Sequence, residues 1–470
     1  MKTYLKNAVK LAAFLTIAVL ILAHLGKVMS VQKFQSRYYS TLSSFEGFYS
    51  LEENTLDVVF LGSSHGYNSY WPQQLYDDFG IRSYNLSTSM QGPIASYYWL
   101  EEVLKTQTPK AVIFEVCFLF HETDEPSIRK AFDPMHLSKN KLRAVKELYA
   151  YDPVLYDPLS FVFPLVRYHE RWKEPQEVFF EWQSLADSNT LKGFYPGFGS
   201  QGEVEGYTFA APSSMDMAQD AGKEVPDNFC LAYLYRMTSL CQEKGISLIL
   251  TSSPSTRWTK SQHNFTAEYA AAHGLPFYDF NCEDIYTGTG YDIEKDNLDS
   301  GHPNLLGTEK ITAFLGEKLS GDFGIQPSAD PQWENTKSCR DLIMEDFVLR
   351  RAYTLPEFLE AADKERYTVY FVTDGKFEPS QESIDILARM GCVWQGGRPV
   401  CAVIEGGGSL TGETELSGAF DGGRYQYRMS VEEKISTIRI GSEEHTWEKG
   451  HFHIAVYDNV LGNVVDIGTY

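Results

Sequence analysis

Short apolar runs that alternate with helical patterns dominate the chain up to about residue 320, and they restrict the fold more than any other feature. The runs cover residues 57–62, 83–87, 111–116, 247–251 and 276–280, and the helical patterns cover 94–105, 227–244, 259–273 and 304–319. Continuous apolar strands joined through helices are typical of a parallel sheet that is buried on both faces. We therefore expect a three-layer α/β domain built on a parallel sheet.

The N-terminal segment contains an apolar run from Leu11 to Gly26, with Lys10 before it and Lys27 after it. Its sixteen residues would cover about 24 Å as a helix, which is short of a hydrocarbon core of about 30 Å unless the two lysines snorkel outward. We expect a transmembrane signal anchor over residues 8–29.

A cleaved signal peptide is the alternative for this segment. Cleavage requires small residues at positions −3 and −1, and the two available pairs, Ile21 with Ala23 and His24 with Gly26, fail at −3. Cations on the two sides of the run nearly balance, so charge alone does not set the orientation. The chemistry described below favours a single-pass protein of the cell membrane with its catalytic domain outside the cytoplasm.

The charge balance excludes one class of partner. The chain carries 41 Lys and Arg against 63 Asp and Glu, a formal net charge of −22. Affinity for nucleic acid comes largely from cations that neutralise phosphates, so we expect no nucleic-acid partner. Seven cysteines are spread singly without a CxxC pair, which predicts neither a disulfide framework nor a zinc site. Cys392 and Cys401 could close a hairpin in an exported domain, and their pairing stays open.

Two breaks in the pattern predict the domain organisation. Residues 121–226 separate the third and fourth strands, which is far longer than an ordinary connection. This insertion, with its aromatic segment 195–199, is either a lid that walls the substrate or a structural cap on the sheet edge. A Pro, Asp and Ser cluster at 326–331 marks a boundary, so we expect one domain over 55–325 and a β-rich α+β domain over 340–470.

One turn of the chain carries a serine in a place suited to catalysis. The first apolar run ends at Gly62 and leads directly into Ser63 and Ser64. These side chains follow a parallel strand at its carboxyl end, where open α/β sheets form ligand sites. A serine hydroxyl needs a base that accepts its proton and a third group that orients the base. Such turns are common without catalysis, but Ser64 is the candidate nucleophile.

The required base and its partner follow the last strand. Asp299 and His302 lie three residues apart, with Gly301 allowing tight curvature and Pro303 suited to the first position of the next helix. On such a turn Asp299 can bond one imidazole nitrogen and leave the other facing the serine. An Asp-x-x-His turn is often only a helix cap. The two motifs together, each at a sheet carboxyl end, predict a triad of Ser64, His302 and Asp299.

These residues resemble the GDSL/SGNH hydrolase superfamily, and especially its membrane-anchored branch of acyltransferases that act on surface glycans and teichoic acids. The resemblance covers about residues 57–319. The turn at Ser64 stands at the position of the family's Gly-Asp-Ser block, and the turn at His302 at that of its closing Asp-x-x-His block. It implies a flavodoxin-like SGNH fold with Ser64 as nucleophile, His302 as base and Asp299 as the residue that orients the base.

The two middle blocks of that family match less well. Asn85 to Ser87 occupies the position of an oxyanion-hole glycine, and Glu115 to Cys117 occupies that of a Gly-x-Asn block. Backbone amides can serve instead, and those of Ser64 and Ser87 are the candidates for the oxyanion hole. Glu115 and Asn85 are candidates for substrate contacts. For Glu115, a paired buried carboxylate is the equal alternative.

The region from about residue 345 to 470 resembles an interleukin-like EMT inducer domain, a lectin-like fold rich in strands. The segments that carry the resemblance are 358–359, 367–372, 387–391, 451–458 and 462–466. It implies binding of carbohydrate or of a surface, without naming the ligand. His451 and His453 would share one strand face, but no Cys or acidic residue has ligand spacing, so we expect no metal.

The combined expectation is an anchored, extracytoplasmic serine O-acyltransferase or esterase that moves a small acyl group, with acetyl as the first choice, onto or off a cell-surface polysaccharide. It would need no cofactor, and the resemblance implies a membrane-bound O-acyltransferase as the partner that supplies the acyl group. The negative charge favours a neutral glycan over teichoic acid, unless that charge is spread evenly for solubility. The alternative is a catalytically silent SGNH-fold protein that binds or assembles glycan, which the weak middle blocks favour.

Overall fold

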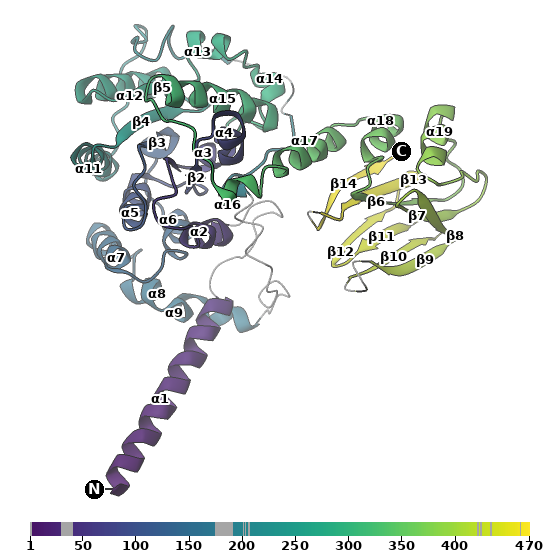
Figure 1. Ribbon diagram of the computed structural model, residues 1–470, viewed down its shortest axis with the longest axis horizontal. Helices are drawn as coiled ribbons and strands as arrows, with labels where there is room; N and C mark the ends of the chain where they lie inside the picture. Colours follow the sequence, from purple (N-terminus) through teal and green to yellow (C-terminus); the bar gives the residue numbers. More distant parts are fainter. Residues whose placement is uncertain are drawn as a thin grey trace. The chain divides into compact units, whose positions relative to one another are not determined.

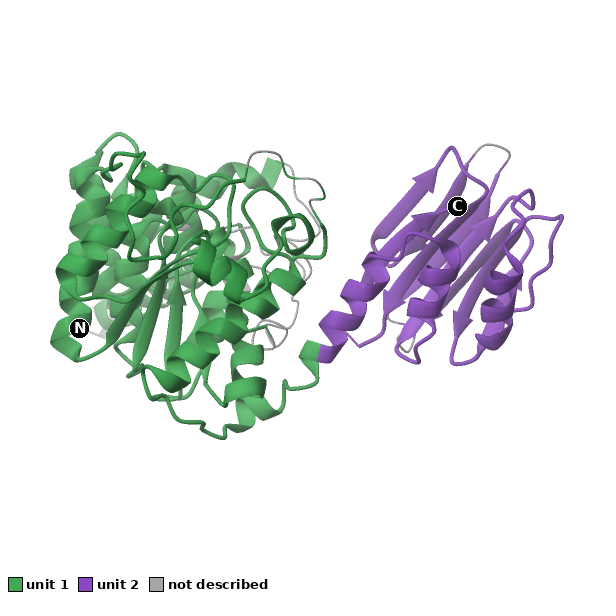
Figure 2. Ribbon diagram, turned by 90° about the horizontal axis from the view of Figure 1, so that it is seen from above, with its two compact units in different colours: residues 1–340 green, residues 341–470 purple. Residues whose placement is uncertain are grey.

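The computed structural model (Figure 1) describes residues 2–29, 41–173, 191–200, 202, 204, 207–420, 423, 425–432, 435–460 and 462–470. The chain divides into two compact units, Met1–Arg340 and Asp341–Tyr470, which are coloured separately in Figure 2. The first unit contains a parallel sheet, and the second contains two antiparallel sheets.

The helices of the first unit vary from single turns to the 28-residue helix α1. They are α1 Lys2–Met29, α2 Thr41–Tyr49, α3 Ser64–Ser69, α4 Pro72–Phe79, α5 Pro93–Val103, η1 Cys117–Phe120, α6 Glu125–Phe132, α7 Lys139–Tyr151, α8 Pro158–Val162, α9 Pro164–Tyr168, η2 His169–Lys173, α11 Asn228–Lys244, α12 Lys260–His273, α13 Glu283–Gly288, α14 Ile293–Asp296, α15 Leu305–Gly321 and α16 Pro331–Glu334. Helix α17, Cys339–Arg350, begins at the division between the units.

The first unit is built around a five-stranded parallel sheet with the strand order β2-β1-β3-β4-β5. The strands are β1 Val58–Leu61, β2 Ser83–Asn85, β3 Ala111–Glu115, β4 Ser247–Ser252 and β5 Phe277–Asp279. Along β1, Val59 and Leu61 pack into the core formed with α5 and α11. Val58 and Phe60 pack into the core formed with α4 and α15. Helices therefore cover both faces of the sheet, and the predicted three-layer α/β fold is confirmed.

Local signals account for the ends of the long helices. Thr259 and Gln262 form a capping box at the start of α12, and the side chains of Asp227 and Asn304 cap α11 and α15. Gly245, with a φ of 68°, ends α11 in the left-handed conformation. The four helices expected from the sequence are present, and their ends differ from the expected ones by two residues at most.

Helix α1 is longer than the apolar run suggested. Its stretch Tyr4–Gly26, 23 residues, is long and apolar enough to cross a membrane. At about 1.5 Å per residue it covers about 34 Å, more than a hydrocarbon core of about 30 Å, but Lys6 and Lys10 lie within it and have to snorkel toward the headgroups. The apolar run from Leu11 is one part of this helix, which begins at Lys2. A signal sequence near an N-terminus has the same properties, so the helix alone does not distinguish an anchor from a signal sequence.

The second unit contains a five-stranded antiparallel sheet of order β14-β13-β6-β7-β8 and a four-stranded antiparallel sheet of order β12-β11-β10-β9. The strands are β6 Tyr367–Thr373, β7 Val400–Glu405, β8 Gly408–Gly412, β9 Glu415–Phe420, β10 Tyr425–Val431, β11 Ser436–Ile440, β12 Glu443–Trp447, β13 Phe452–Asp458 and β14 Asn463–Thr469. The expected β-rich character of this region is confirmed.

A shared core joins the two sheets of the second unit, with Val372 and Cys401 on one side and Met429 and Ile438 on the other. Helices α18, Leu355–Ala362, and α19, Gln381–Arg389, pack into a second core with the five-stranded sheet. Cys392 and Cys401 are both buried and unbonded.

Replacing Gly62 by alanine is expected to destabilise the first unit by about 1–3 kcal/mol, the usual cost of a strained backbone position. Gly62 has a φ of 146°, and a Cβ there would lie 2.8 Å from the Cβ of Glu115. Denaturant unfolding measures the loss. Gly288→Ala is the matched control, because a Cβ at Gly288 meets no heavy atom within 4 Å. An equal loss in the two variants would contradict the argument.

Candidate active site

The turn after β1 presents Ser64 at the first position of α3. Ser63 caps this helix, and its hydroxyl accepts a hydrogen bond from the His65 N–H at 3.2 Å. The same hydroxyl donates to Glu115 Oε2 at 2.9 Å, and Ser63 is fully buried. Ser63 therefore points into the protein, whereas the hydroxyl of Ser64 points toward His302.

Asp299 and His302 lie on the tight loop between α14 and α15. A bridge between Asn297 and Pro303 closes this loop. Asp299 Oδ1 accepts hydrogen bonds from the backbone N–H groups of Gly301 and His302, at 2.8 and 3.0 Å. The backbone of the turn thus holds the carboxylate in place before the imidazole contacts it.

The structure brings Ser64, His302 and Asp299 together. His302 Nε2 lies 2.8 Å from Ser64 Oγ, and His302 Nδ1 lies 2.9 Å from each carboxylate oxygen of Asp299. Burial raises the pKa of Asp299, but the hydrogen bonds from His302 and from the Gly301 N–H outweigh burial and lower that pKa to about 2. Asp299 is therefore ionised at neutral pH. It holds the proton on Nδ1 and leaves Nε2 to accept the proton of the serine.

The two predicted substrate contacts are corrected by the structure, because both side chains are buried. The amide of Asn85 donates to the carbonyl groups of Gly66 and Tyr70, at 2.9 and 3.2 Å. Glu115 accepts hydrogen bonds from the Ser63 hydroxyl and from the Cys117 N–H. Both polar groups hold the catalytic turn instead of facing a substrate. For Glu115, the alternative of a buried carboxylate is the better interpretation.

The two candidate oxyanion amides differ in their availability. The Ser87 N–H donates to Asn85 Oδ1 at 3.2 Å, so it is already engaged. The N–H groups of His65 and Gly66 bond to Ser63. Among the described residues the Ser64 N–H has no acceptor, so it is available to a carbonyl oxygen next to the nucleophile.

Tyr67 is a residue of the site that sequence reasoning missed. Its hydroxyl lies near enough to Ser64 for that side chain to influence its titration, and burial raises the pKa of Tyr67, so the hydroxyl keeps its proton. A signal was present, because Tyr67 follows Ser64 by three residues and side chains at this spacing are neighbours on a helix. The ring of Tyr67 packs against that of Tyr195 with centroids 5.4 Å apart.

The aromatic segment 195–199 borders both catalytic motifs. The Tyr195 N–H donates to the Tyr67 carbonyl at 2.9 Å, beside the nucleophile. The Leu305 N–H donates to the Gly197 carbonyl at 3.0 Å, at the start of the helix that follows the histidine. This part of the insertion therefore connects α3 to the start of α15.

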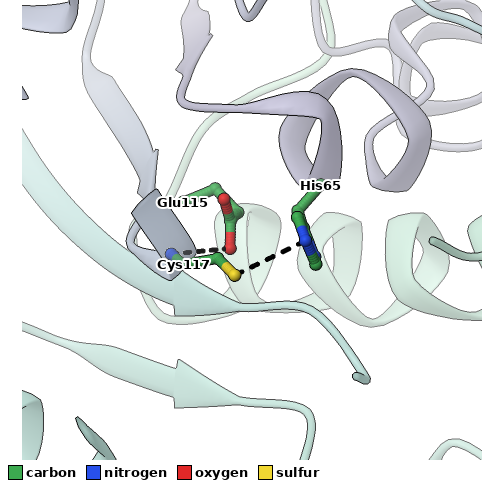
Figure 3. A group of neighbouring side chains, drawn as sticks. All are labelled: His65, Glu115 and Cys117. Atoms are coloured by element: carbon green, nitrogen blue, oxygen red, sulfur yellow. Dashed lines mark hydrogen bonds between the residues drawn. The ribbon is translucent and has the colours of Figure 1, made fainter. Parts of the chain in front are cut away.

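His65, Glu115 and Cys117 form a buried cluster beneath the catalytic turn (Figure 3). Cys117 Sγ lies 3.4 Å from His65 Nε2, and the three residues offer metal-ligand atoms within 4.8 Å of one another. Both Glu115 oxygens already accept hydrogen bonds from protein groups, so we describe the cluster as a hydrogen-bond network. Burial, followed by the nearby charge of His302, lowers the pKa of His65 to about 3. Burial raises the pKa of Glu115 to about 7.

A second buried group with metal-ligand atoms consists of His263, Asp279 and Cys282. His263 Nδ1 lies 2.7 Å from Asp279 Oδ2, and Trp258 donates to the same oxygen at 2.8 Å. The other ring nitrogen of His263 lies 2.7 Å from the Asp216 carbonyl. With both ring nitrogens occupied, this group also serves as a hydrogen-bond network.

No family model matches the sequence, and no curated protein matches it either. Similar solved structures include a proposed lipolytic protein of the G-D-S-L family from Desulfitobacterium hafniense DCB-2, with 12% identity and a TM-score of 0.27 over 55% of this chain and 97% of that chain. A GDSL-like lipase from Bacteroides thetaiotaomicron VPI-5482 has 11% identity and a TM-score of 0.27 over 60% and 99%. A proposed acylhydrolase from Bacteroides fragilis NCTC 9343 has 12% identity and a TM-score of 0.27 over 59% of this chain and 94% of that chain. Likenesses at this TM-score establish no kinship, so the function rests on the geometry of the site.

Glu115→Gln tests the raised pKa of the buried carboxyl group. With a pKa near 7, the folded protein keeps a proton that the unfolded chain loses near pH 4.5, so wild-type stability falls as the pH rises between these values. Glutamine does not titrate. The difference in unfolding temperature, variant minus wild type, should therefore increase from pH 5 to pH 8 in thermal unfolding. A constant difference over this range would mean that the pKa of Glu115 is ordinary.

Proposed function

We propose that the first unit is a serine esterase or O-acyltransferase in which Ser64 is the nucleophile, His302 the general base and Asp299 the residue that orients the base. The observation that carries this proposal is the 2.8 Å contact of His302 Nε2 with Ser64 Oγ, between residues 238 positions apart in the chain. Asp299 bonds to the opposite ring nitrogen. A nucleophile, a base and an orienting carboxylate in this order are what serine acyl transfer requires.

The reaction would proceed in two steps. The Ser64 oxygen attacks the carbonyl carbon of an ester while His302 Nε2 takes the hydroxyl proton, and the alcohol leaves with that proton to give an acyl-enzyme. Water or a sugar hydroxyl then gives its proton to Nε2 and attacks the acyl carbon, which releases Ser64. Asp299 stays ionised and stabilises the imidazolium in both steps. The sequence of steps needs no cofactor.

The carbonyl oxygen becomes negatively charged in each step and needs hydrogen-bond donors. We assign this role to the Ser64 N–H and to the Tyr67 hydroxyl, which lie beside the nucleophile. They would replace the glycine and asparagine donors of the SGNH blocks that this sequence lacks. Loss of one such donor typically lowers the rate by about 10²–10³.

We place the substrate among cell-surface polysaccharides, with acetyl as the transferred group. Two observations support this part of the proposal: α1 is long and apolar enough to cross a membrane, and the catalytic motifs resemble the anchored acyltransferase branch of the SGNH hydrolases. A membrane-bound O-acyltransferase would supply the acyl group across the bilayer. The second unit, with its two packed antiparallel sheets, would hold the polymer.

A catalytically silent glycan-binding or assembly protein is the second candidate. The observation that favours it is that the Ser87 N–H bonds to Asn85, while Asn85 donates to backbone carbonyl groups. Two potential oxyanion donors are thereby lost. The two candidates differ in the reactivity of Ser64. An enzyme has an activated serine there, whereas a catalytically silent protein keeps the fold without an activated serine.

A fluorophosphonate probe is expected to label the purified protein at Ser64, as measured by intact-mass spectrometry. Ser64→Ala should abolish labelling, whereas Ser63→Ala should keep measurable labelling at lower stability, because it removes the bond to Glu115 and the cap of α3 but no catalytic group. Asp299→Asn should slow labelling by about 10³–10⁴, since the imidazole loses its orienting carboxylate. Absence of labelling in the folded wild type would favour the silent protein. Labelling of the Ser64→Ala variant would show that a residue other than Ser64 is the nucleophile.

Acetyl transfer from a model ester is expected to favour neutral oligosaccharides over polyglycerol phosphate at low salt. The formal net charge of −22 repels polyanions at long range. At physiological salt, with a Debye length of about 8 Å, the preference should become smaller. Mass spectrometry of the acceptors measures the yield. A preference for the phosphate polymer at low salt would refute the neutral acceptor.

A further inference from the structure

Large apolar side chains are exposed on three consecutive short helices of the first unit, α8, α9 and η2, and at Phe163, which joins α8 to α9. Leu159, Phe163, Val166 and Trp172 have 59, 58, 47 and 63% of their surface exposed. Single apolar residues are normal on a protein surface. Four large ones on adjoining helices, two of them aromatic, are typical of a contact surface.

These helices adjoin the end of the apolar helix α1. Gly26 is buried there, and a Cβ on Gly26 would contact Leu165 of α9 at 3.8 Å. Arg171 of η2 donates from Nη1 to the carbonyl of Met29 at 2.9 Å. The last turn of α1 is thus packed against the same helices that expose the apolar side chains.

The sequence of α1 indicates where a bilayer around it would end. The apolar stretch Tyr4–Gly26 is followed by a lysine, so the hydrocarbon core ends close to Gly26. Residues that contact Gly26 and Met29 must lie at the same level. Leu165 and Arg171 therefore place α9 and η2 at the boundary between headgroups and acyl chains.

We propose that α8, α9 and η2 form a membrane-interfacial surface that inserts Leu159, Phe163, Val166 and Trp172 into the bilayer crossed by α1. This inference rests on the membrane-anchored form of the proposed function. The occupant is lipid because the surface is continuous with the end of the spanning helix. Attachment through α1 and through this surface would restrict the tilt of the first unit on the bilayer.

The charged residues of these helices indicate which force holds the surface. Arg167 pairs with Glu125, and Lys173 pairs with Glu170. Because carboxylates match two of the three cations and the third, Arg171, donates to the Met29 carbonyl, burial of apolar area provides most of the attachment and attraction to anionic headgroups a smaller part. Insertion should therefore depend weakly on salt and on anionic lipid.

The test uses the full-length protein in phosphatidylcholine vesicles, with the environment-sensitive fluorophore NBD on one introduced cysteine. All seven native cysteines are buried, so labelling is directed to the new site. Phe163→Cys and Val166→Cys report on the surface, and Leu15→Cys reports on α1. Tyr235→Cys on α11 is the matched control, because Tyr235 is 45% exposed. Emission wavelength and quenching by lipids spin-labelled at acyl carbon 5 measure depth.

We expect the probes that replace Phe163 and Val166 to be quenched several-fold more than the control, with little change on adding phosphatidylglycerol or salt. Quenching at Leu15 without quenching at Phe163 and Val166 would overturn the surface and leave the anchor. A blue-shifted probe at Phe163 that lipid does not quench would mean that a protein partner or a second copy covers the surface, which overturns the proposal as well. Absence of quenching at Leu15 would show that α1 does not cross the bilayer, and it would overturn the proposed surface together with the anchor. Fluorophosphonate labelling of Ser64 in the same vesicles tests the esterase separately.

Discussion

The hydrogen bond from the Ser63 hydroxyl to the buried carboxylate of Glu115 is the contact on which the site depends. It ties the turn after β1 to the end of β3, and the same hydroxyl caps α3 by accepting the His65 N–H. With Ser63 held in this way, Ser64 takes the next position along the turn, which is the first of α3. The hydroxyl of Ser64 contacts His302, which lies 238 residues later in the chain.

Burial and hydrogen bonding set different charge states for His65 and Asp299, which lie on either side of the catalytic turn. Beneath the turn, His65 is neutral because its pKa is lowered to about 3. Above it, hydrogen bonds lower the pKa of Asp299 to about 2 and keep that carboxylate ionised. The ring of His65 lies 4.9 Å from that of His302. A neutral His65 adds no positive charge that would oppose formation of the imidazolium on His302.

The resemblance to SGNH hydrolases would place oxyanion donors at two positions that have a different role in this structure. Asn85 and Glu115 occupy those positions, and their hydrogen bonds stabilise the catalytic turn instead. The proposed function assigns the role instead to the Ser64 N–H and to the hydroxyl of Tyr67, one turn further along α3. In the proposed mechanism the short helix α3 would therefore supply both the nucleophile and the groups that stabilise the charge.

Local sequence determined the layers of the first unit and the pairing of Asp299 with His302. Continuous apolar runs and helical periodicity indicate strands and helices directly, and a three-residue turn brings a carboxylate to an imidazole without help from the rest of the fold. Tertiary structure decided what the polar residues at the strand ends do. Whether Glu115 faces a substrate or the interior depends on Ser63, 52 residues earlier in the chain, and the meeting of Ser64 with His302 spans 238 residues. Such contacts follow from the parallel pairing of β1, β3 and β4. Packing between strands that are distant in the sequence sets the direction of each side chain, and a local sequence pattern does not specify that direction.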